Sequence, residues 1–267
     1  MGRFEKMFER LAQKKEGAFM PFTVIGDPSL PASEEIIEAL IAGGADALEL
    51  GIPFSDPVAD GPTIQAAGIR ALEAGATPGG CFDVIQRIRA AHPEIPIGLL
   101  VYANLVIARG ADHFFGRAGE AGVDAVLVVD LPTFEAEAFA PVAEGHGVEP
   151  VFIVPPNADD ARLEAIARLT KGYTYVVARS GVTGCDDAVS IGHQSVFQKL
   201  RELGAPPTML GFGISTPDHV RTGLDAGADG VISGSAVVGR VEKGAADLEK
   251  LTRDLIEFAT AMKTATR

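Results

Sequence analysis

One carboxylate in the sequence occupies a position where an ionised side chain is costly. Glu49 lies in the apolar run 47–52 and is flanked by Leu48 and Leu50. A buried carboxylate must be paired, or its pKa must rise so that it stays neutral. If Glu49 points into the interior, a raised pKa suits it for proton transfer near neutral pH. The competing interpretation is an internal ion pair, because buried ion pairs also perturb pKa values.

Two further carboxylates follow in a loop that is rich in proline. Asp56 and Asp60 lie within residues 53–62, a connection long enough to form a functional lid or a partner contact. A lone aspartate in a loop of Pro and Gly is more often a turn residue than a catalyst. The spacing therefore marks the loop as a candidate functional segment and leaves its role open.

Residues 179–184, with the sequence Arg-Ser-Gly-Val-Thr-Gly, have the composition of a loop that closes over a substrate. Gly181 and Gly184 permit hinge torsions, and Thr183 offers a hydroxyl. The alternative interpretation is a surface loop that takes no part in catalysis.

Two other glycine-containing segments are candidates for phosphate binding. They are residues 211–215 and residues 232–238, and the second opens a short predicted helix that includes Ser235. Glycine lets the backbone approach an anion, and a helix N-terminus presents N–H groups that lack a partner within the helix. α/β barrels often bind phosphate after their last two strands. Outside a barrel, each segment would be merely a tight turn.

The remaining chemistry-bearing residues argue against a Schiff base and against a metal site. None of the lysines falls at the C-terminal end of a predicted strand, where a Schiff-base lysine would lie. The five histidines fall in or beside predicted helices rather than in a ligand cluster. Cys81 and Cys185 have no metal-binding spacing. We therefore expect catalysis by carboxylates and hydroxyls, without a metal.

The composition is that of a globular protein with an acidic surface. The 267 residues include 23 Lys and Arg and 36 Asp and Glu, and 47% are hydrophobic. A net charge of −13 argues against broad binding to nucleic acid or to anionic membranes. The first residues lack the pattern of a secretory signal, and no apolar run reaches the ~18 residues of a membrane span. We expect a cytoplasmic protein.

A recurring phrase indicates the elements that position these residues. Glycine, then Asp, then an apolar run occurs within 42–50, 121–128 and 226–232. Glycine ends a helix, Asp occupies the tight turn, and the apolar run indicates a parallel strand buried on both faces. Together with the other apolar runs, the pattern predicts strands at 19–25, 47–52, 97–102, 125–129, 150–154, 173–178, 209–212 and 230–233.

Amphipathic helical stretches alternate with these eight strands, which is typical of a closed α/β barrel or of an open doubly wound sheet. Eight strands favour closure, and the absence of GxGxxG after the first strand disfavours a dinucleotide-binding open sheet. We predict a single (β/α)8 TIM barrel domain over residues 1–267. It has an extra N-terminal helix at 4–14, a short phosphate-binding helix after strand eight, and a final helix at 248–262.

Several segments resemble the tryptophan synthase alpha subunit family. They are Pro-Phe at 21–22 with Gly-Asp-Pro at 26–28, and residues 45–65, 102–104, 155–158, 179–184 and 211–215, of which 48–65 is highly specific. The resemblance runs from the first helix to the last, with a modest departure at 185–187. It implies a barrel that cleaves indole-3-glycerol phosphate into indole and glyceraldehyde 3-phosphate without a cofactor of its own.

The resemblance also implies roles for individual residues. Glu49 would protonate the indole carbon that bears the side chain, Asp60 would stabilise positive charge at the ring N–H, and Tyr175 would lie near the glycerol chain. The implied substrate-binding residues are Phe22, Leu100, Thr183, Phe212 and Ile232. The implied phosphate-binding residues are Gly184, Gly213, Gly234 and Ser235.

In this family the alpha subunit joins a beta subunit in an α2β2 heterotetramer, and indole passes to pyridoxal phosphate in the beta subunit. The resemblance therefore implies a partner contact that includes Asp56, Pro57 and Asn104.

Three alternatives stay open at this point. A stand-alone lyase that releases indole would share the same catalytic residues. A phosphosugar isomerase of the same barrel type would use Asp27 and Asp130 as acid and base; the role of Asp130 is otherwise unassigned. A regulatory barrel that only binds phosphate would leave the inward Glu49 unexplained.

Overall fold

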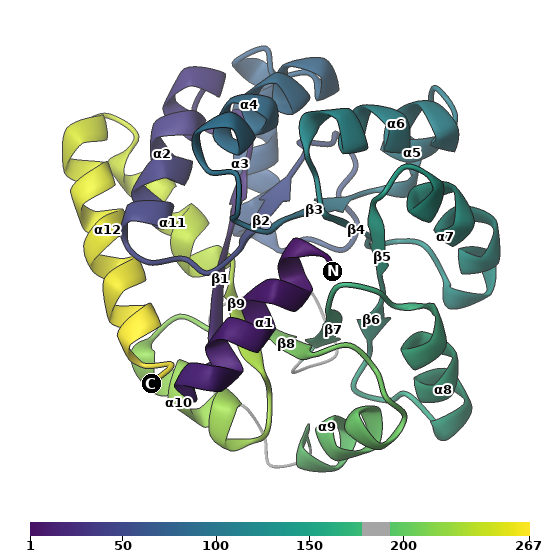
Figure 1. The fold of residues 1–267 in the computed structure, drawn as a ribbon. Coiled ribbons are helices and arrows are strands. Elements are labelled where there is room, and N and C mark those ends of the chain that lie inside the picture. Colours follow the sequence, from purple (N-terminus) through teal and green to yellow (C-terminus); the bar gives the residue numbers. More distant parts are fainter. Residues whose placement is uncertain (178–192) are drawn as a thin grey trace.

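In residues 1–177 and 193–267, which the computed structural model describes, nine parallel strands form the central sheet. The strands are β1 (Ala18–Val24), β2 (Leu48–Gly51), β3 (Ile97–Val101), β4 (Ala125–Val128), β5 (Glu149–Val151), β6 (Ile153–Val154), β7 (Thr174–Val177), β8 (Thr208–Gly211) and β9 (Gly230–Ser233). Their order in space is β5-β4-β3-β2-β1-β9-β8-β7-β6, and the sheet curls into a nearly closed barrel (Figure 1).

The two ends of the sheet meet where the chain passes from β5 to β6. β5 pairs with β4, β6 pairs with β7, and Phe152 alone separates the two segments. The predicted strand at 150–154 is therefore divided, because the backbone turns from one neighbouring strand to the other at this residue. The (β/α)8 class is confirmed, with the fifth barrel strand in two pieces.

The other strands begin and end within one residue of their predicted bounds. Residue 178, at the end of the predicted sixth strand, lies outside the described residues. The accuracy has a physical basis, since each of these strands is an apolar run buried along its length and bounded by polar or turn residues.

In the recurring motif of glycine, Asp and an apolar run, the aspartates form hydrogen bonds that join neighbouring strands. The carboxylates of Asp46, Asp124 and Asp229 accept hydrogen bonds of 3.0, 2.8 and 2.8 Å from backbone N–H groups near the start of β1, β3 and β8. In each case the aspartate precedes the next strand in space, namely β2, β4 or β9. Each aspartate thus ties the beginnings of two neighbouring strands and satisfies an N–H that the sheet leaves unpaired.

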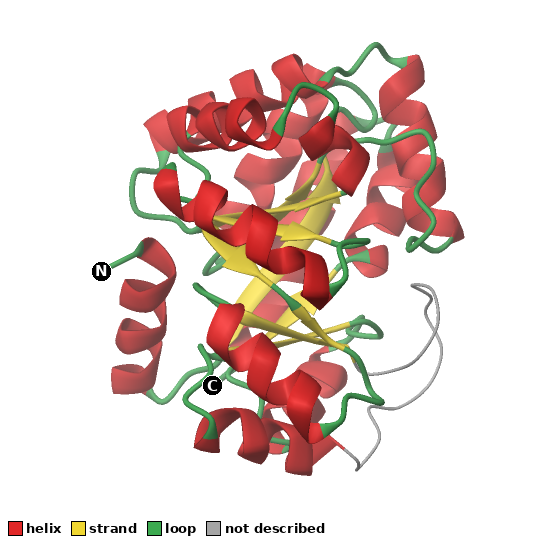
Figure 2. Ribbon diagram, turned by 90° about the vertical axis from the view of Figure 1, so that its right-hand side faces the viewer, coloured by secondary structure: helices red, strands yellow, loops and turns green. Residues whose placement is uncertain are grey.

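Helices surround the strands (Figure 2). They are α1 (Arg3–Lys14), α2 (Leu30–Ala42), α3 (Pro62–Glu73), α4 (Pro78–Ala91), α5 (Ala103–Ile107), α6 (Ala111–Ala121), η1 (Thr133–Glu135), α7 (Ala136–Gly145), α8 (Asp160–Leu169), α9 (His193–Glu202), α10 (Pro217–Asp225), α11 (Ser235–Gly244) and α12 (Leu248–Thr264). The predicted N-terminal, post-strand-eight and final helices are α1, α11 and α12. The first and last extend one and two residues beyond their predicted bounds.

Helix α1 lies across the N-terminal end of the barrel (Figure 1). Its apolar side, which includes Phe4 and Leu11, joins the cluster of side chains inside the barrel. The Phe4 ring packs against Tyr173, with centroids 4.9 Å apart. The opposite, C-terminal end of the barrel is therefore the end left to the loops that follow the strands.

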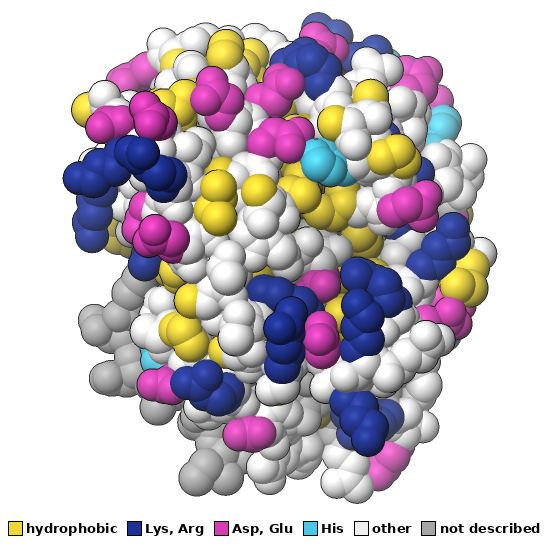
Figure 3. Space-filling model, turned by 60° about the vertical axis from the view of Figure 1, so that its left-hand side comes forward, with side chains coloured by type: hydrophobic (Ala, Val, Ile, Leu, Met, Phe, Trp, Pro, Cys, Tyr) yellow, Lys and Arg dark blue, Asp and Glu magenta, His cyan; other side chains and the backbone are white. Residues whose placement is uncertain are grey.

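Two further apolar clusters fill the space between the sheet and the outer helices. On the face in Figure 3, acidic and basic side chains are interspersed. Among the described residues, no helix is both long enough and apolar enough to cross a bilayer.

Candidate active site

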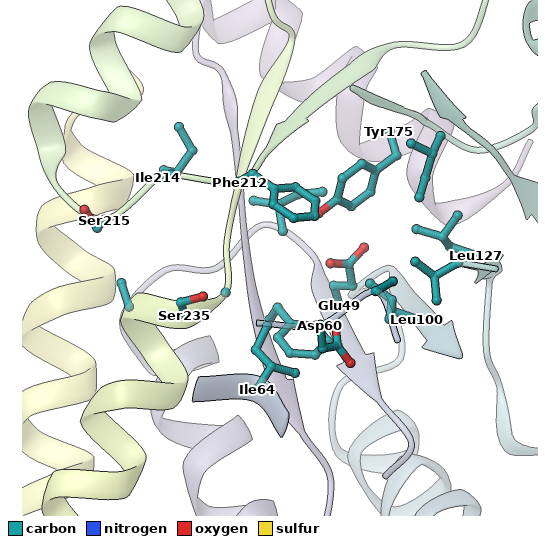
Figure 4. Close-up of a pocket in the computed structure, with 18 residues that line it drawn as sticks. Glu49, Asp60, Ile64, Leu100, Leu127, Tyr175, Phe212, Ile214, Ser215 and Ser235 are labelled. Atoms are coloured by element: carbon teal, nitrogen blue, oxygen red, sulfur yellow. The ribbon is translucent and has the colours of Figure 1, made fainter. Parts of the chain in front are cut away.

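A pocket opens at the C-terminal ends of the strands, and the space between its lining residues, including the part open to solvent, is about 670 Å³. Its walls are mainly apolar, and its polar side chains and backbone groups come from the segments after β2, β8 and β9, from Glu49 on β2 and from Tyr175 on β7. Figure 4 shows side chains from several strands converging on it. The lining residues are Phe22, Glu49, Ala59, Asp60, Ile64, Leu100, Leu127, Val129, Ile153, Tyr175, Phe212, Gly213, Ile214, Ser215, Ile232, Gly234, Ser235 and Ala236.

Glu49 points inward from β2, as predicted, and only 1% of it is exposed. The Tyr173 hydroxyl donates a hydrogen bond of 3.0 Å to Glu49 Oε1. Burial raises the pKa of Glu49 to about 8; the hydrogen bond from Tyr173 opposes that rise, and the Asp60 carboxyl adds to it. Among residues 1–177 and 193–267, no Lys or Arg forms an ion pair with Glu49, so the ion-pair interpretation is wrong for the described chain.

Tyr173 was not among the residues predicted to act with Glu49. Tyr173 and Tyr175 are two residues apart, and side chains two apart on an extended chain point to the same face. Once Tyr175 was expected to face the pocket, that alternation was the available signal for Tyr173. Both tyrosines are buried, which raises their pKa values and keeps their hydroxyls protonated.

Asp60 is the second carboxyl of the pocket and lies just before α3. It is 8% exposed, and burial raises its pKa to about 6, although a hydrogen bond with the Tyr102 side chain lowers it. In the view of Figure 4, the Glu49 carboxyl lies between Asp60 and the rings of Tyr175 and Phe212. Near pH 7 the arrangement therefore holds one carboxyl mainly protonated and the other mainly ionised.

The predicted apolar residues come together around these two acids. Phe22, Leu100, Phe212 and Ile232 all line the pocket, as does Tyr175. The rings of Tyr175 and Phe212 meet edge to face, with centroids 6.3 Å apart. These walls suit a flat aromatic group, because they supply apolar area on several sides.

The backbone after β8 turns sharply beside this wall. Phe212 has a φ of +68° and Gly213 a φ of +79°. A left-handed conformation is unfavourable for a residue with a side chain, and such strain is typical of functional sites. This left-handed turn brings both the Phe212 ring and the Gly213 backbone, which carries no side chain, to the wall of the pocket.

The predicted phosphate-binding residues lie at one end of the pocket. Gly213, Gly234 and Ser235 all line it, and Gly234 immediately precedes α11, whose first residue is Ser235. The first-turn N–H groups of a helix favour an anion. In Figure 4, Ser235 and Ser215 lie at the end away from Leu100 and Leu127. Thr183 and Gly184 lie outside the described residues.

The predicted partner-contact residues lie at the rim of the same face. Asp56 and Asn104 are exposed and Pro57 is half-buried. None of the three lines the pocket.

The acid and base proposed for an isomerase do not meet in the pocket. Asp27 is buried, and Arg70 pairs with it through two hydrogen bonds of 2.9 and 2.8 Å. Asp130 accepts a hydrogen bond of 2.7 Å from the Ala103 N–H at the start of α5. Both carboxylates therefore serve the structure, and the isomerase hypothesis loses its catalytic pair. Within the described ranges, no three His, Cys, Asp or Glu residues form a group that suits a metal ion.

The family model for the tryptophan synthase alpha chain matches residues 8–267. The chain belongs to the tryptophan synthase alpha chain family. Its sequence is 54% identical over 267 residues to the tryptophan synthase alpha chain of Yersinia pestis and 50% identical to that of Vibrio vulnificus; each match covers 100% of both chains.

Solved structures of tryptophan synthase alpha chains have the same fold. The Legionella pneumophila subunit aligns with a TM-score of 0.89 at 29% identity, covering 100% of this chain and 98% of that one. The Pyrococcus furiosus alpha subunit aligns with a TM-score of 0.83 at 34% identity, covering 92% and 98%. The family predicted from the sequence is confirmed.

Proposed function

We propose that this pocket cleaves indole-3-glycerol phosphate to indole and glyceraldehyde 3-phosphate, the alpha half-reaction of tryptophan synthase. The observation that carries the proposal is the pairing of two buried carboxyls with separated pKa values in one apolar pocket. Such a pair supplies an acid and a charged acceptor at the same pH. Membership in the tryptophan synthase alpha chain family supports the choice of reaction.

Glu49 is the general acid in this proposal. Its proton goes to the indole carbon that bears the glycerol chain, which makes the ring a cation and therefore a good leaving group. The carbon–carbon bond then breaks, its electron pair returns to the ring, and the hydroxyl of the adjacent carbon becomes the aldehyde of the product. The Glu49 carboxylate takes up the proton from that hydroxyl, so the acid is regenerated in one turnover.

Asp60 stabilises the cationic ring in this proposal. Its carboxylate accepts a hydrogen bond from the indole N–H, which becomes more acidic when the ring is protonated. That interaction is stronger in the transition state than in the substrate, as catalysis requires. The pKa of Asp60, about 6, leaves it mainly ionised at pH 7.

The remaining lining residues bind the substrate. Phe22, Leu100, Phe212 and Ile232 hold the indole ring, and Tyr175 lies beside the glycerol chain. Gly213, Gly234 and Ser235 receive the phosphate through backbone N–H groups and a hydroxyl. Thr183 remains a predicted substrate contact and Gly184 a predicted phosphate contact.

We further propose that a tryptophan synthase beta subunit docks on the rim of the pocket, in an α2β2 complex whose pyridoxal phosphate belongs to the beta subunit. Three large hydrophobic side chains are exposed there, in the segments that follow β2, β3 and β4. Val58 is 75% exposed, Ile107 52% and Phe134 79%. Such residues beside Asp56, Pro57 and Asn104 are typical of a protein contact rather than of a free surface.

The same proposal places the protein in the cytoplasm, since a phosphorylated substrate does not cross a lipid bilayer unaided.

An indole-release assay on the purified chain, with and without a beta subunit, tests the function. We expect slow release by the chain alone and strong activation by the partner. Fast release that the partner does not change would favour a stand-alone lyase, and no release in either case would refute the proposal.

A further inference from the structure

Tyr102 touches the loop that carries Asp60 at two places. It follows β3, immediately precedes α5 and is 3% exposed. Its hydroxyl oxygen accepts a hydrogen bond of 3.2 Å from the Ala59 N–H, and its side chain is hydrogen-bonded to the Asp60 carboxyl. Its ring stacks on Phe54, with centroids 5.2 Å apart and planes at 27°.

These contacts fix the direction of each hydrogen bond. A phenol has one O–H to donate and lone pairs with which to accept. Because the Ala59 N–H occupies a lone pair, the single hydroxyl hydrogen is left for the Asp60 carboxylate. Burial and the neighbouring Asp60 carboxyl raise the pKa of Tyr102, so its hydroxyl stays protonated and remains a donor at neutral pH.

We infer that Tyr102 is a positioning residue for the reaction, holding the Asp60 carboxylate ionised and aimed at the indole N–H. This inference rests on the proposed function. Tyr102 does not line the pocket, so it acts through Asp60 and not on the substrate. The stack on Phe54 holds the start of the loop while the hydroxyl holds its end.

The charges around Asp60 make such a donor necessary. Within residues 1–177 and 193–267, the titratable groups that face it are Glu49 on β2, Tyr102 after β3 and Tyr175 on β7, while Asp130 after β4 acts on Tyr102. All of these are acids, so none supplies positive charge. A hydrogen bond to the charged form is then the means that opposes burial and keeps Asp60 ionised at neutral pH.

The test is the pH dependence of kcat/KM for Tyr102→Phe, measured on the full chain saturated with beta subunit. Phenylalanine keeps the ring and its stack on Phe54 but removes the hydroxyl. Without the donor, the pKa of Asp60 rises. We expect the acidic limb of the profile to move up by about one pH unit, with about tenfold less activity on that limb and recovery toward wild-type activity above it.

Two comparisons separate positioning from general damage. Asp60→Asn should lose activity at every pH, because an amide has no charge to regain. 3-Fluorotyrosine at position 102 is nearly the same size as tyrosine and is a stronger hydrogen-bond donor, so it should move the acidic limb to lower pH. If Tyr102→Phe does not fold, the position of the acidic limb in this variant tests the inference instead.

The inference is overturned if the acidic limb stays in place, or if activity falls by the same factor at every pH. Either outcome, with the wild-type enzyme releasing indole normally, would leave the proposed function intact. Failure of the wild-type enzyme to release indole would count against the function itself.

Discussion

The Tyr173 hydroxyl reaches Glu49 Oε1 across 3.0 Å from the far side of the barrel interior. Below it, the Phe4 ring of α1 packs against Tyr173. The acid of the pocket is thus supported from the opposite end of the barrel by an element that precedes the first strand. The donor is uncharged, so it orients Glu49 without fixing it as an anion.

Removing this donor should change the alkaline side of the activity profile. The hydrogen bond from Tyr173 lowers the pKa of Glu49 against its burial, so Tyr173→Phe raises that pKa. Glu49 then stays protonated to higher pH, and the alkaline limb of kcat/KM should shift upward while the acidic limb stays in place. An alkaline limb that moves down or does not move would contradict this role of Tyr173.

The wild-type enzyme should itself show a bell-shaped profile of kcat/KM. Activity needs Asp60 ionised, so it should fall below about pH 6, and it needs Glu49 protonated, so it should fall above about pH 8. Steady-state indole release between pH 5 and 9.5 measures both limbs. A profile that rises monotonically with pH would mean that Glu49 acts only as a base.

A hydrogen-bond network at the N-terminal end of the barrel leads to a prediction about stability. Asp124 accepts hydrogen bonds from Arg3, from Arg89 and from the Ile97 N–H at 2.8, 2.7 and 2.8 Å. Asp124→Ala removes the carboxylate partner of the largely buried Arg89 guanidinium, which keeps its hydrogen bonds to backbone carbonyls, and leaves the Ile97 N–H without its acceptor. Because Arg3 is partly exposed, we expect a loss of about 2–3 kcal/mol in the free energy of unfolding, measured by urea denaturation.

The control for this change is an exposed ion pair. Asp218 pairs with Arg221, and its side chain is 84% exposed. Asp218→Ala should alter the free energy of unfolding by less than about 0.5 kcal/mol. Equal losses of unfolding free energy in the two variants would show that the Asp124 network stabilises the fold no more than an exposed ion pair does.

Sequence patterns predicted the strands well because buried parallel strands need continuous apolar runs, and a misplaced charge such as Glu49 is then conspicuous. The pocket acids and walls were predicted through the family resemblance. The hydroxyl partners Tyr173 and Tyr102 were missed, because a tyrosine in an apolar run does not disclose which carboxyl its hydroxyl will meet. The break at Phe152 was missed for a related reason, since the change of neighbouring strand leaves no mark on an apolar run.

The docking surface can be tested with matched isoleucines. Ile107 is 52% exposed at the pocket rim, and Ile69 is 55% exposed on the outer helix α3. Ile107→Asp should weaken binding of the beta subunit at least about tenfold, about 1.4 kcal/mol, because it would place a charge in an apolar contact. Ile69→Asp should bind normally. Titration calorimetry gives both dissociation constants, and equal weakening would contradict the proposed surface.

The proposed cleavage depends on the buried Glu49 carboxyl, which delivers the proton that releases indole. The turnover of Glu49→Gln tests this role, because glutamine keeps the shape of the side chain and an acceptor for the Tyr173 hydroxyl. We predict that kcat falls by about 10³-fold while a non-cleavable substrate analogue binds as tightly as it does to the wild type. Turnover close to the wild-type rate would remove Glu49 from the mechanism.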